Sequence, residues 1–347
     1  MGRPIRTFHE LVGQQRLVSL VRDLCRGARR DGRAIPPLLL VGPAGSGKAC
    51  LARAISRETG GQLRALLGAP DLTRVHLVDV LAETRPNDVV MIEDIHRLSG
   101  AVLALLAEAI GHGKIPSSDG PKLDRSRPIP LPDLLTIIGT TDAPGRLPPS
   151  LGTRFLALSL APYSTAELKA IVMSIARQQE RDVTPQAARA LAEAAEGSPR
   201  LASVLLDTIA LAAGQSRVTE AVVRVELERA GLDKFGFWPR HRTYLRALCD
   251  ADDAGLGLEA LSIRTGFNAA YIRRDIEPLL FAKGLIQIRG SSRWLSEEGA
   301  THARAIAARE ARSTLDGAFS DDATRSNESA SSDAAERDSD VPLESSI

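Results

Sequence analysis

Residues 42–49 read Gly42-Pro43-Ala44-Gly45-Ser46-Gly47-Lys48-Ala49 and decide the fold class of this chain. The apolar run at 38–41 before them is typical of a buried parallel strand, and the segment after Lys48 has helical spacing that ends at Gly60. A glycine-rich loop between a strand and a helix binds phosphate, because its backbone N–H groups and the helix N-terminus face the negative oxygens. Lys48 then reaches the β- and γ-phosphates. The sequence therefore predicts a nucleotide-binding α/β domain.

This phosphate-binding loop departs from its usual pattern at the last position. Ala49 stands where a Ser or Thr hydroxyl normally binds Mg²⁺, and the thiol of Cys50 is a poor ligand for this hard cation. We therefore expect a nucleotide to bind and Mg²⁺ to be held less firmly. The predicted nucleotide contacts in this segment are Gly42, Gly45, Ser46, Gly47, Lys48, Ala49 and Cys50.

A second acidic motif follows at residues 88–94, which read Asp-Val-Val-Met-Ile-Glu-Asp. A buried strand that ends in two carboxylates is the Walker B pattern, in which one acid is associated with Mg²⁺ and the next orients the attacking water. The usual order is Asp then Glu, whereas here Glu93 takes the metal position and Asp94 the water position. Because an error of about 1 Å in a catalytic group can cost roughly 100-fold in rate, the exchange is expected to matter. An acidic pair that only caps a strand is the simpler alternative.

The length and composition fit a protein with two or three domains. The chain has 347 residues, of which 44% are hydrophobic and 25% are charged. No leader-like apolar segment opens the sequence, and no apolar stretch approaches the roughly 18 residues that span a bilayer. Cys25, Cys50 and Cys249 are far apart and show no metal-ligand spacing, which is typical of reduced thiols. We expect a cytoplasmic protein without a membrane segment.

The net charge of +1 hides an asymmetry between the two ends of the chain. Residues 313–347 hold nine Asp or Glu and two Arg, a net charge of −7, so the rest of the chain carries +8. This tail is rich in Ser, Ala and Asp and has little to bury, so it is expected to be disordered. An inert solvated tail and a tail that repels nucleic acid or contacts a partner both remain open.

The hydrophobic pattern divides the chain into segments. Expected helices at 16–30, 47–59 and 100–111 alternate with expected strands at 38–41, 88–92 and 134–139, which is typical of a parallel sheet flanked by helices. A proline-rich basic insertion at 114–130 is expected to form a protruding hairpin or loop, and residues 165–231 are helical throughout. The predicted domains are 1–162 (nucleotide-binding α/β), 163–234 (helical lid), 235–302 (winged helix) and 303–347 (acidic tail).

The winged helix is predicted from three helices followed by two short strands. Asn268 is expected to cap the third helix, which runs to Lys283, and residues 290–292 join the strands. In this variant of the helix-turn-helix, the wing often contacts the DNA backbone. Four arginines are placed to contact phosphates: Arg273, Arg274, Arg289 and Arg293. A winged helix that binds protein instead of DNA is the alternative.

The order of these segments resembles the RuvB family, the AAA+ motors of Holliday-junction branch migration. The resemblance covers about residues 3–300, and many motifs in one order are far more specific than any one of them. It rests on Arg3-Pro4 with Phe8-His9-Glu10-Leu11-Val12-Gly13-Gln14, Ile92-Glu93-Asp94-Ile95-His96-Arg97-Leu98, Ile138-Gly139-Thr140-Thr141, Leu151-Gly152-Thr153-Arg154-Phe155, Gly197-Ser198-Pro199-Arg200, Ile276-Glu277-Pro278-Leu279 and Lys283-Gly284-Leu285-Ile286-Gln287.

The resemblance implies ATP hydrolysis with Mg²⁺ by a hexameric ring on duplex DNA and Holliday junctions, in recombination and repair. The implied partners are a RuvA-like protein, docked through the hairpin at 114–130, and a RuvC-like resolvase. Arg154 would reach a neighbouring subunit's nucleotide, and Arg200 would sense the γ-phosphate from the lid. With these two, the implied catalytic residues are Lys48, Glu93 and Asp94, and the further nucleotide contacts are Arg3, Thr141, Asp142 and Tyr163.

This sequence departs from the family pattern where hydrolysis takes place. Besides Ala49 and the exchanged acids, Asp142 stands where a neutral Thr or Asn is usual, and Gly152 replaces an arginine. One hypothesis is that Asp142 partly compensates for Ala49 by helping to hold the metal. Three functions therefore stay open: a working branch-migration motor, an ATP-binding but hydrolysis-poor paralogue in a homomeric or mixed ring, and a clamp-loader-like or transcription-linked AAA+ protein.

Overall fold

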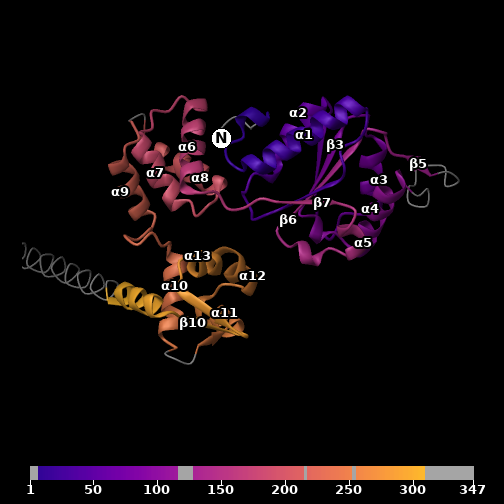
Figure 1. Ribbon diagram of the computed structural model, residues 1–347. Coiled ribbons are helices and arrows are strands. Elements are labelled where there is room, and N and C mark those ends of the chain that lie inside the picture. Colours follow the sequence, from indigo (N-terminus) through magenta and orange to yellow (C-terminus); the bar gives the residue numbers. More distant parts are fainter. Residues whose placement is uncertain (1–6, 116–127, 215–216, 252–254, 309–347) are drawn as a thin grey trace, which may run out of the picture. The chain divides into compact units, whose positions relative to one another are not determined.

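The computed structural model describes residues 7–115, 128–214, 217–251 and 255–308 (Figure 1). The chain forms two compact units, Met1–Ala230 and Gly231–Ile347. Residues 309–347 of the predicted acidic tail lie outside the described residues, as does Arg3, whereas the first residues of that tail, 303–308, are helical, with Ala303 and Ile306 buried in the core of the second unit. The finer division into four domains stays a prediction.

A five-stranded parallel sheet forms the centre of the first unit, in the order β2-β3-β6-β1-β7. The predicted α/β class is therefore confirmed, with strands β1 (Leu38–Val41), β3 (Val89–Glu93) and β6 (Thr136–Thr141) at the centre. Two edge strands, β2 (Leu63–Leu67) and β7 (Leu156–Ser159), were not predicted. Both are only partly buried, so neither shows the continuous apolar run of a central strand.

Helices cover both faces of this sheet (Figure 1). Leu38 and Leu40 point to the face covered by α1 (Gln15–Asp31) and α2 (Lys48–Thr59), while Leu39 points to the other face. There it packs in one core with α3 (Arg74–Ala82), which was not predicted, and α4 (Gly100–His112). Because the strands are parallel, the carboxyl ends of β1, β3 and β6 meet at one edge, where ligands bind in such sheets.

Short elements connect the sheet to its surroundings. Strands β4 (Lys114–Ile115) and β5 (Ile129–Pro130) pair antiparallel after α4, with the Ile115 side chain fully buried. They form the base of the predicted hairpin, and residues 116–127 lie outside the described part of the chain. The remaining short helices are η1 (Phe8–Glu10), η2 (Ile95–Arg97), η4 (Pro144–Arg146) and α5 (Pro149–Gly152).

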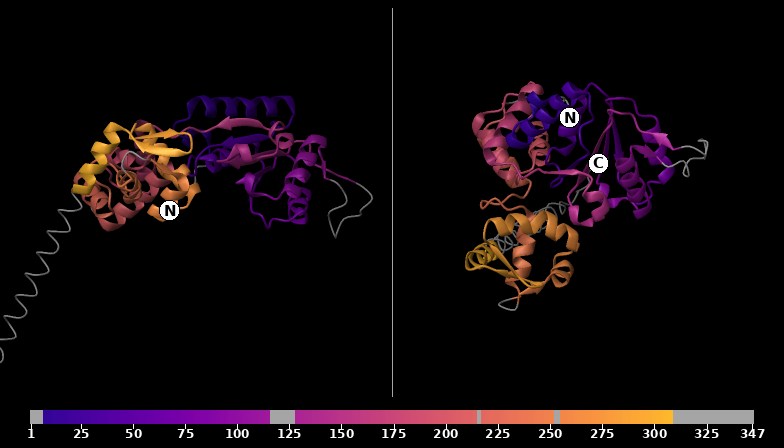
Figure 2. Two further views of the ribbon diagram at one scale, coloured as in Figure 1. Left: turned by 90° about the horizontal axis from the view of Figure 1, so that it is seen from below. Right: turned by 45° about the vertical axis from the view of Figure 1, so that its right-hand side comes forward.

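The predicted helical segment after the sheet consists of α6 (Thr165–Gln178), α7 (Pro185–Ala194), α8 (Pro199–Ala212) and α9 (Glu220–Arg229) (Figure 2). Each begins after a Ser or Thr whose side chain accepts a backbone N–H, which satisfies donors that a helix start leaves unpaired. Glu167 completes a capping box with Ser164 and also accepts the Gln14 N–H at 3.2 Å. Hydrogen bonds from Ser164 are the main reason that the pKa of Glu167 lies below its usual value.

The second unit has the helices and strands of the predicted winged helix. Helices α10 (Pro239–Cys249) and α11 (Leu258–Thr265) precede a third helix made of α12 (Ala269–Tyr271), a π-helical turn η6 (Ile272–Ile276) and α13 (Glu277–Ala282). Strands β8 (Leu256–Gly257), β10 (Ser292–Leu295) and β9 (Ile286–Arg289) form its antiparallel sheet.

The third helix of this unit begins and bends at identifiable residues. Asn268 caps it, as predicted, by accepting the Tyr271 N–H at 2.9 Å. Pro278 lacks a backbone N–H and cannot continue the regular helical bonding, which explains the π-helical turn just before it. The turn carries Arg273 and Arg274 outward while Ile272 and Ile276 stay fully buried.

A buried polar triad lies in the core of the second unit. Arg293 Nε donates to Glu277 Oε1 at 2.7 Å, and the Tyr244 hydroxyl donates to the same oxygen at 3.0 Å. Arg293 and Glu277 side chains are each only 7% exposed. Burial, and next the Glu277 carboxylate, raise the pKa of Tyr244. These contacts make Glu277 the shared acceptor of two buried donors.

Replacing Glu277 by alanine is expected to destabilise this unit by about 3–5 kcal/mol, because it leaves the Arg293 charge buried without its partner. Both tryptophans of the chain, Trp238 and Trp294, lie in this unit, so urea unfolding followed by tryptophan fluorescence reports on it. Glu298→Ala is the matched control, because that side chain is exposed. Equal unfolding midpoints for the two variants would contradict the structural role of the triad.

Candidate functional site

A cavity of about 500 Å³ opens at the carboxyl edge of the parallel sheet. Its walls come from the segment before α1, the glycine-rich loop, the ends of β3 and β6, and helices α6 and α8 of the same unit. Seven of the predicted nucleotide-site residues line it: Gly45, Gly47, Lys48, Ala49, Cys50, Tyr163 and Arg200. Glu93 and Asp94 line it as well, so the topology brings these distant sequence positions together.

The glycine-rich loop has the conformation that phosphate binding needs. Gly45 and Gly47 adopt positive φ angles of 78° and 94°, and α2 begins directly after them at Lys48. Lys48 Nζ donates to the carbonyl oxygens of Gly42 and Pro43 at 2.7 and 2.8 Å. The Ser46 hydroxyl is buried and has no hydrogen-bond partner within the described residues. Donors held around a helix N-terminus fit an anionic phosphate group.

The charges around Lys48 come from several elements. Burial is the largest influence and lowers its pKa from the usual lysine value, while the carboxylates of Asp142, Asp94 and Glu93 raise it and the Arg200 guanidinium lowers it. Three carboxylates and the Arg200 guanidinium thus act on the charge of Lys48, and of these acids Glu93 and Asp94 line the cavity. Phosphate oxygens would be attracted by Lys48 and Arg200.

Arg200 and Tyr163 reach the loop because glycines leave room for them. A Cβ placed on Gly45 would lie 2.7 Å from the Arg200 Cβ, so any side chain there would collide with the start of α8. A Cβ on Gly47 would lie 3.2 Å from the Tyr163 hydroxyl. Burial raises the pKa of Tyr163 to about 12, so its hydroxyl stays protonated at neutral pH.

The predicted acidic pair lies at the end of β3. Asp94 has a left-handed backbone (φ 49°), and its N–H donates to Thr140 Oγ1 at 3.3 Å. Both Glu93 and Asp94 line the cavity. Their carboxylate oxygens could coordinate Mg²⁺ together with phosphate oxygens and water. Ala49 supplies no ligand to such an ion. The donor set therefore fits Mg²⁺, with one protein ligand fewer than a loop ending in Ser or Thr would give.

The end of β6 places two neighbouring threonines differently. Thr140 lines the cavity, whereas Thr141, the predicted nucleotide contact, is fully buried. Thr141 Oγ1 lies 2.9 Å from His96 Nδ1 and accepts the Ala143 N–H at 3.0 Å. The side chain that faces the cavity from this strand is thus that of Thr140. Successive side chains of a strand point to opposite faces, so only one of two neighbouring threonines can face the cavity. The sequence does not show which of the two does.

Arg154 lies outside the cavity of its own chain. It is exposed beside α5, and its Nε donates to the Ser150 carbonyl at 3.2 Å. A Cβ on Gly111 would collide with Arg154 Nη1, so the guanidinium rests on α4 where that helix has no side chain. This position leaves Arg154 unable to complete its own nucleotide site.

The predicted DNA-contacting arginines of the second unit differ in exposure. Arg273 and Arg274 are exposed on the π-helical turn, and Arg274 Nε pairs with Asp275 at 2.8 Å. Arg289 is exposed on β9 and donates to Gln287 at 2.7 Å. Arg293 differs, because it is buried in the ion pair with Glu277. The Arg293 guanidinium therefore stabilises the fold of this unit, and the candidate DNA-contacting residues are Arg273, Arg274 and Arg289.

The comparisons with known proteins agree with this geometry. Residues 3–160 match the family model for the Holliday junction DNA helicase RuvB P-loop domain, and residues 234–304 match the RuvB C-terminal winged helix domain. The chain is 32% identical over 304 residues to the Holliday junction branch migration complex subunit RuvB of Paramagnetospirillum magneticum, covering 86% of this chain and 87% of that protein. The chain belongs to the RuvB family.

Further relatives extend the similarity to RuvB over most of the chain. The RuvB subunit of Chloroflexus aggregans is 30% identical, with 81% of this chain and 82% of that protein covered. The solved structure of the Thermotoga maritima RuvB Holliday junction branch migration motor superposes with a TM-score of 0.76 at 25% identity, over 87% of this chain and 98% of that one. The predicted fold class, an AAA+ core with a winged helix, is thereby confirmed.

Several residues that line the cavity were not among the residues predicted for the site. Leu11 and Val12 from the N-terminal segment and Ile171 and Ile175 from α6 give one end of the cavity an apolar wall, which suits a flat aromatic base. Ile171 and Ile175 are four residues apart, so the sequence indicates that they share one face of a helix. It does not indicate that this face lies near the glycine-rich loop. His96 and Thr140 lie within motifs that define the RuvB resemblance, yet only the fold shows their contacts.

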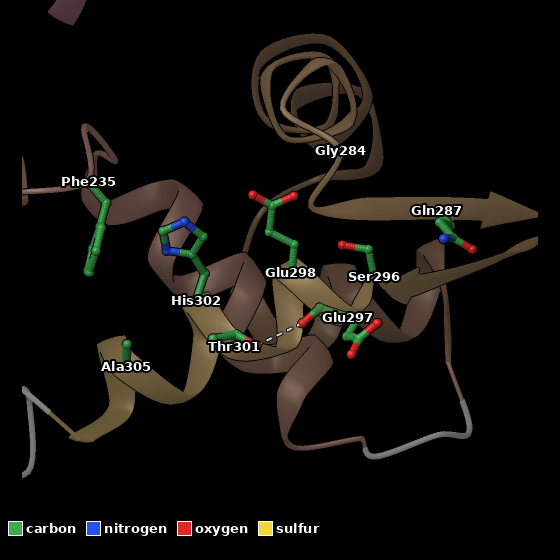
Figure 3. A pocket seen from close by; sticks show the side chains of 9 residues that line it. All are labelled: Phe235, Gly284, Gln287, Ser296, Glu297, Glu298, Thr301, His302 and Ala305. Carbon is green, nitrogen blue, oxygen red and sulfur yellow. Dashed lines mark hydrogen bonds between the residues drawn. The ribbon is translucent and has the colours of Figure 1, made fainter.

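A second cavity, of about 680 Å³, lies in the winged helix and is unsuited to nucleic acid. Figure 3 shows its walls: the Phe235 loop, Gly284, the strand residue Gln287, and the helix that begins after Ser296. Glu297 and Glu298 contribute carboxylates to it, and no Lys or Arg is among the described residues that line it. Phosphates would be repelled here, so a DNA-binding surface of this unit is expected around the exposed arginines instead.

None of the helices in the described part of the chain combines the length and apolar character that a membrane-spanning helix needs.

Proposed function

We propose that this member of the RuvB family is an ATP-dependent motor of Holliday junction branch migration that acts in recombination and DNA repair. The observation that carries the proposal is the single cavity in which Lys48, the Glu93–Asp94 pair and Arg200 converge from three separate elements. The α/β domain and the helical lid would bind ATP with Mg²⁺, and the winged helix would bind duplex DNA. The work would take place in the cytoplasm.

The roles of the residues follow from their positions. Lys48 and Arg200 would hold the phosphates from the two sides of the cavity, and Tyr163 would pack beside the loop. Glu93 and Asp94 supply the two carboxylates that metal binding and water orientation require. Mg²⁺, when bound, would neutralise developing charge on the phosphates. An arginine would still be needed to stabilise the transition state, and Arg154 is too far outside its own cavity to provide it.

Arg154 therefore supports a ring. An exposed arginine that lies beyond its own nucleotide can act on a neighbour's nucleotide when subunits assemble head to tail. We propose a hexameric ring, homomeric or mixed with another RuvB-like chain. A RuvA-like protein would dock on the β4–β5 hairpin, and a RuvC-like resolvase would follow at the same junction.

Steady-state ATP hydrolysis with Mg²⁺, with and without four-way junction DNA, tests the proposal. Turnover that the junction stimulates would support a working motor in spite of Ala49 and the exchanged acids. Tight ATP binding without turnover would instead make the chain a hydrolysis-poor ring subunit, and preference for one duplex sequence over junctions would favour a transcription-linked role.

The exposed arginines of the third helix give a prediction for DNA binding. The double substitution Arg273→Ala and Arg274→Ala is expected to weaken binding to duplex DNA equally for all sequences, because each residue is proposed to contact phosphate, which carries no sequence information. The slope of log K against log salt should become shallower by about one for each phosphate that the variant no longer neutralises.

Fluorescence anisotropy with labelled duplexes at several salt concentrations measures both quantities. Arg304→Ala is the matched control, since this exposed arginine lies on the helix after β10, near the acidic cavity. A salt slope that stays the same in the double variant would show that these two arginines do not contact the DNA backbone.

A further inference from the structure

Three metal-ligating side chains converge at the ends of β3 and β6. Asp94 and His96 follow β3 and Asp142 follows β6, and one ligand atom from each lies within 4.8 Å of the other two. All three are partly buried, with the His96 side chain only 9% exposed. Two carboxylates and one imidazole at this spacing form a donor set that can close around a single cation.

The ring of His96 is held in one orientation. Its Nδ1 is hydrogen-bonded to Thr141 Oγ1 at 2.9 Å, and that hydroxyl is itself fixed by the Ala143 N–H. The other ring nitrogen, Nε2, therefore faces Asp142, with 3.6 Å between Nε2 and Oδ1. A histidine whose second nitrogen is held by a buried partner is the usual arrangement of a metal ligand. Thr141, which is buried and does not line the cavity, would thus orient the ring of His96 for metal binding.

The cluster lies on the phosphate side of the cavity. Asp94 lines that cavity, and among the carboxylates that influence Lys48, the charge of Asp142 acts more strongly than those of Asp94 and Glu93. Two carboxylates this close repel each other unless a cation lies between them. Since Ala49 removes one metal ligand from the loop, a cation at this cluster would supply positive charge near the phosphates from the ends of β3 and β6.

We propose that Asp94, His96 Nε2 and Asp142 bind a divalent first-row transition-metal ion, Mn²⁺ being the one suited to phosphate chemistry. Mg²⁺ binds almost only oxygen, whereas a set of carboxylates and an imidazole is typical of first-row transition-metal ions, of which Mn²⁺ is the one that also favours carboxylate and water. Asp142, which departs from the family pattern, supplies the ligand that makes the set complete. The cluster includes Asp94 and not Glu93, so Asp94 is the acid of the pair that would bind this second ion.

That this ion lies beside nucleotide phosphates rests on the proposed function. That the three side chains bind the ion does not depend on the proposed function. The test is therefore made on the full chain without nucleotide. Electron paramagnetic resonance measures free Mn²⁺ during a titration, and the bound ion is then examined for hyperfine coupling to an imidazole nitrogen. We expect one Mn²⁺ per chain with such coupling, and retention of the ion in excess Mg²⁺.

Two substitutions and their controls localise the site. Asp142→Asn and His96→Gln should each weaken Mn²⁺ binding by about tenfold or more, because loss even of an outer-shell partner costs ~10–100-fold in metal affinity. The matched controls are Asp71→Asn and His112→Gln, which alter exposed residues. Both control variants should bind Mn²⁺ as tightly as the unaltered chain does. The nitrogen coupling should vanish in His96→Gln only.

The results separate this inference from the proposed motor function. Absence of nitrogen coupling in the unaltered chain, full displacement of Mn²⁺ by Mg²⁺, or equal affinities in all four variants would overturn the site, whatever the ATPase activity is. Mn²⁺ binding with the expected reductions in a chain that does not hydrolyse ATP would uphold the site and contradict the motor.

Discussion

Replacing Lys48 by alanine is expected to abolish ATP hydrolysis and to weaken ATP binding by roughly 30-fold or more. The Lys48 ammonium is the loop's own cation, held by the carbonyls of Gly42 and Pro43 at the phosphate end of the cavity. Removing one partner of a buried charge pair costs about 2–5 kcal/mol, which corresponds to this factor or more in the dissociation constant. Isothermal titration with a non-hydrolysable ATP analogue measures the binding, and phosphate release measures the turnover.

The control for this prediction is Lys114→Ala. Lys114 is exposed on β4 and does not line the cavity, so its removal changes the net charge equally without touching the nucleotide site. Unchanged nucleotide affinity in Lys48→Ala would mean that the cavity does not bind ATP through this loop.

Replacing Arg154 by alanine is expected to lower the turnover number by about 10³–10⁵-fold, the range for loss of an arginine that acts on a phosphoryl transition state. ATP binding to the isolated subunit should stay the same, because Arg154 is absent from the cavity of its own chain. The exposed Arg146→Ala is the matched control. The measurements are ATP turnover at saturating protein and nucleotide affinity at low protein concentration.

Mixing the two variants distinguishes action on a neighbour from action within one chain. A Lys48→Ala subunit keeps Arg154, and an Arg154→Ala subunit keeps its loop, so mixed rings contain interfaces with both residues intact. Turnover in the mixture should exceed that of either variant alone. If the mixture is as inactive as its components, Arg154 does not act across a subunit interface.

The strength of a local pattern explains which parts of the fold could be predicted. Strand β1, the loop and α2 were predicted almost to the residue, because a continuous apolar run, special glycines and helical spacing follow one another there. Strands β2 and β7 were missed because edge strands are half exposed and lack this signal. The π-helical turn was also missed, although Pro278 is visible in the sequence, because the helical pattern continues through it.

The candidate site shows the same division. The loop residues and the acidic pair carry their chemistry in adjacent positions, so the sequence was sufficient to propose them. Arg293 was expected at the wing surface, but its side chain is buried in an ion pair with Glu277, a partner on the third helix that the sequence does not indicate. Thr140 and Thr141 are neighbours of the same type, and only the alternation along β6 decides which one faces the cavity.

The sequence by itself determined that this protein is a RuvB-like AAA+ ATPase with a winged helix, because ordered local motifs specify loop chemistry and element type. The tertiary structure alone decided which distant residues meet. It placed Arg200 against Gly45, kept Arg154 out of its own cavity, and brought His96 to Asp142. The physical reason is that strand order and side-chain alternation fix contacts between segments dozens of residues apart, and neither is written in any single segment.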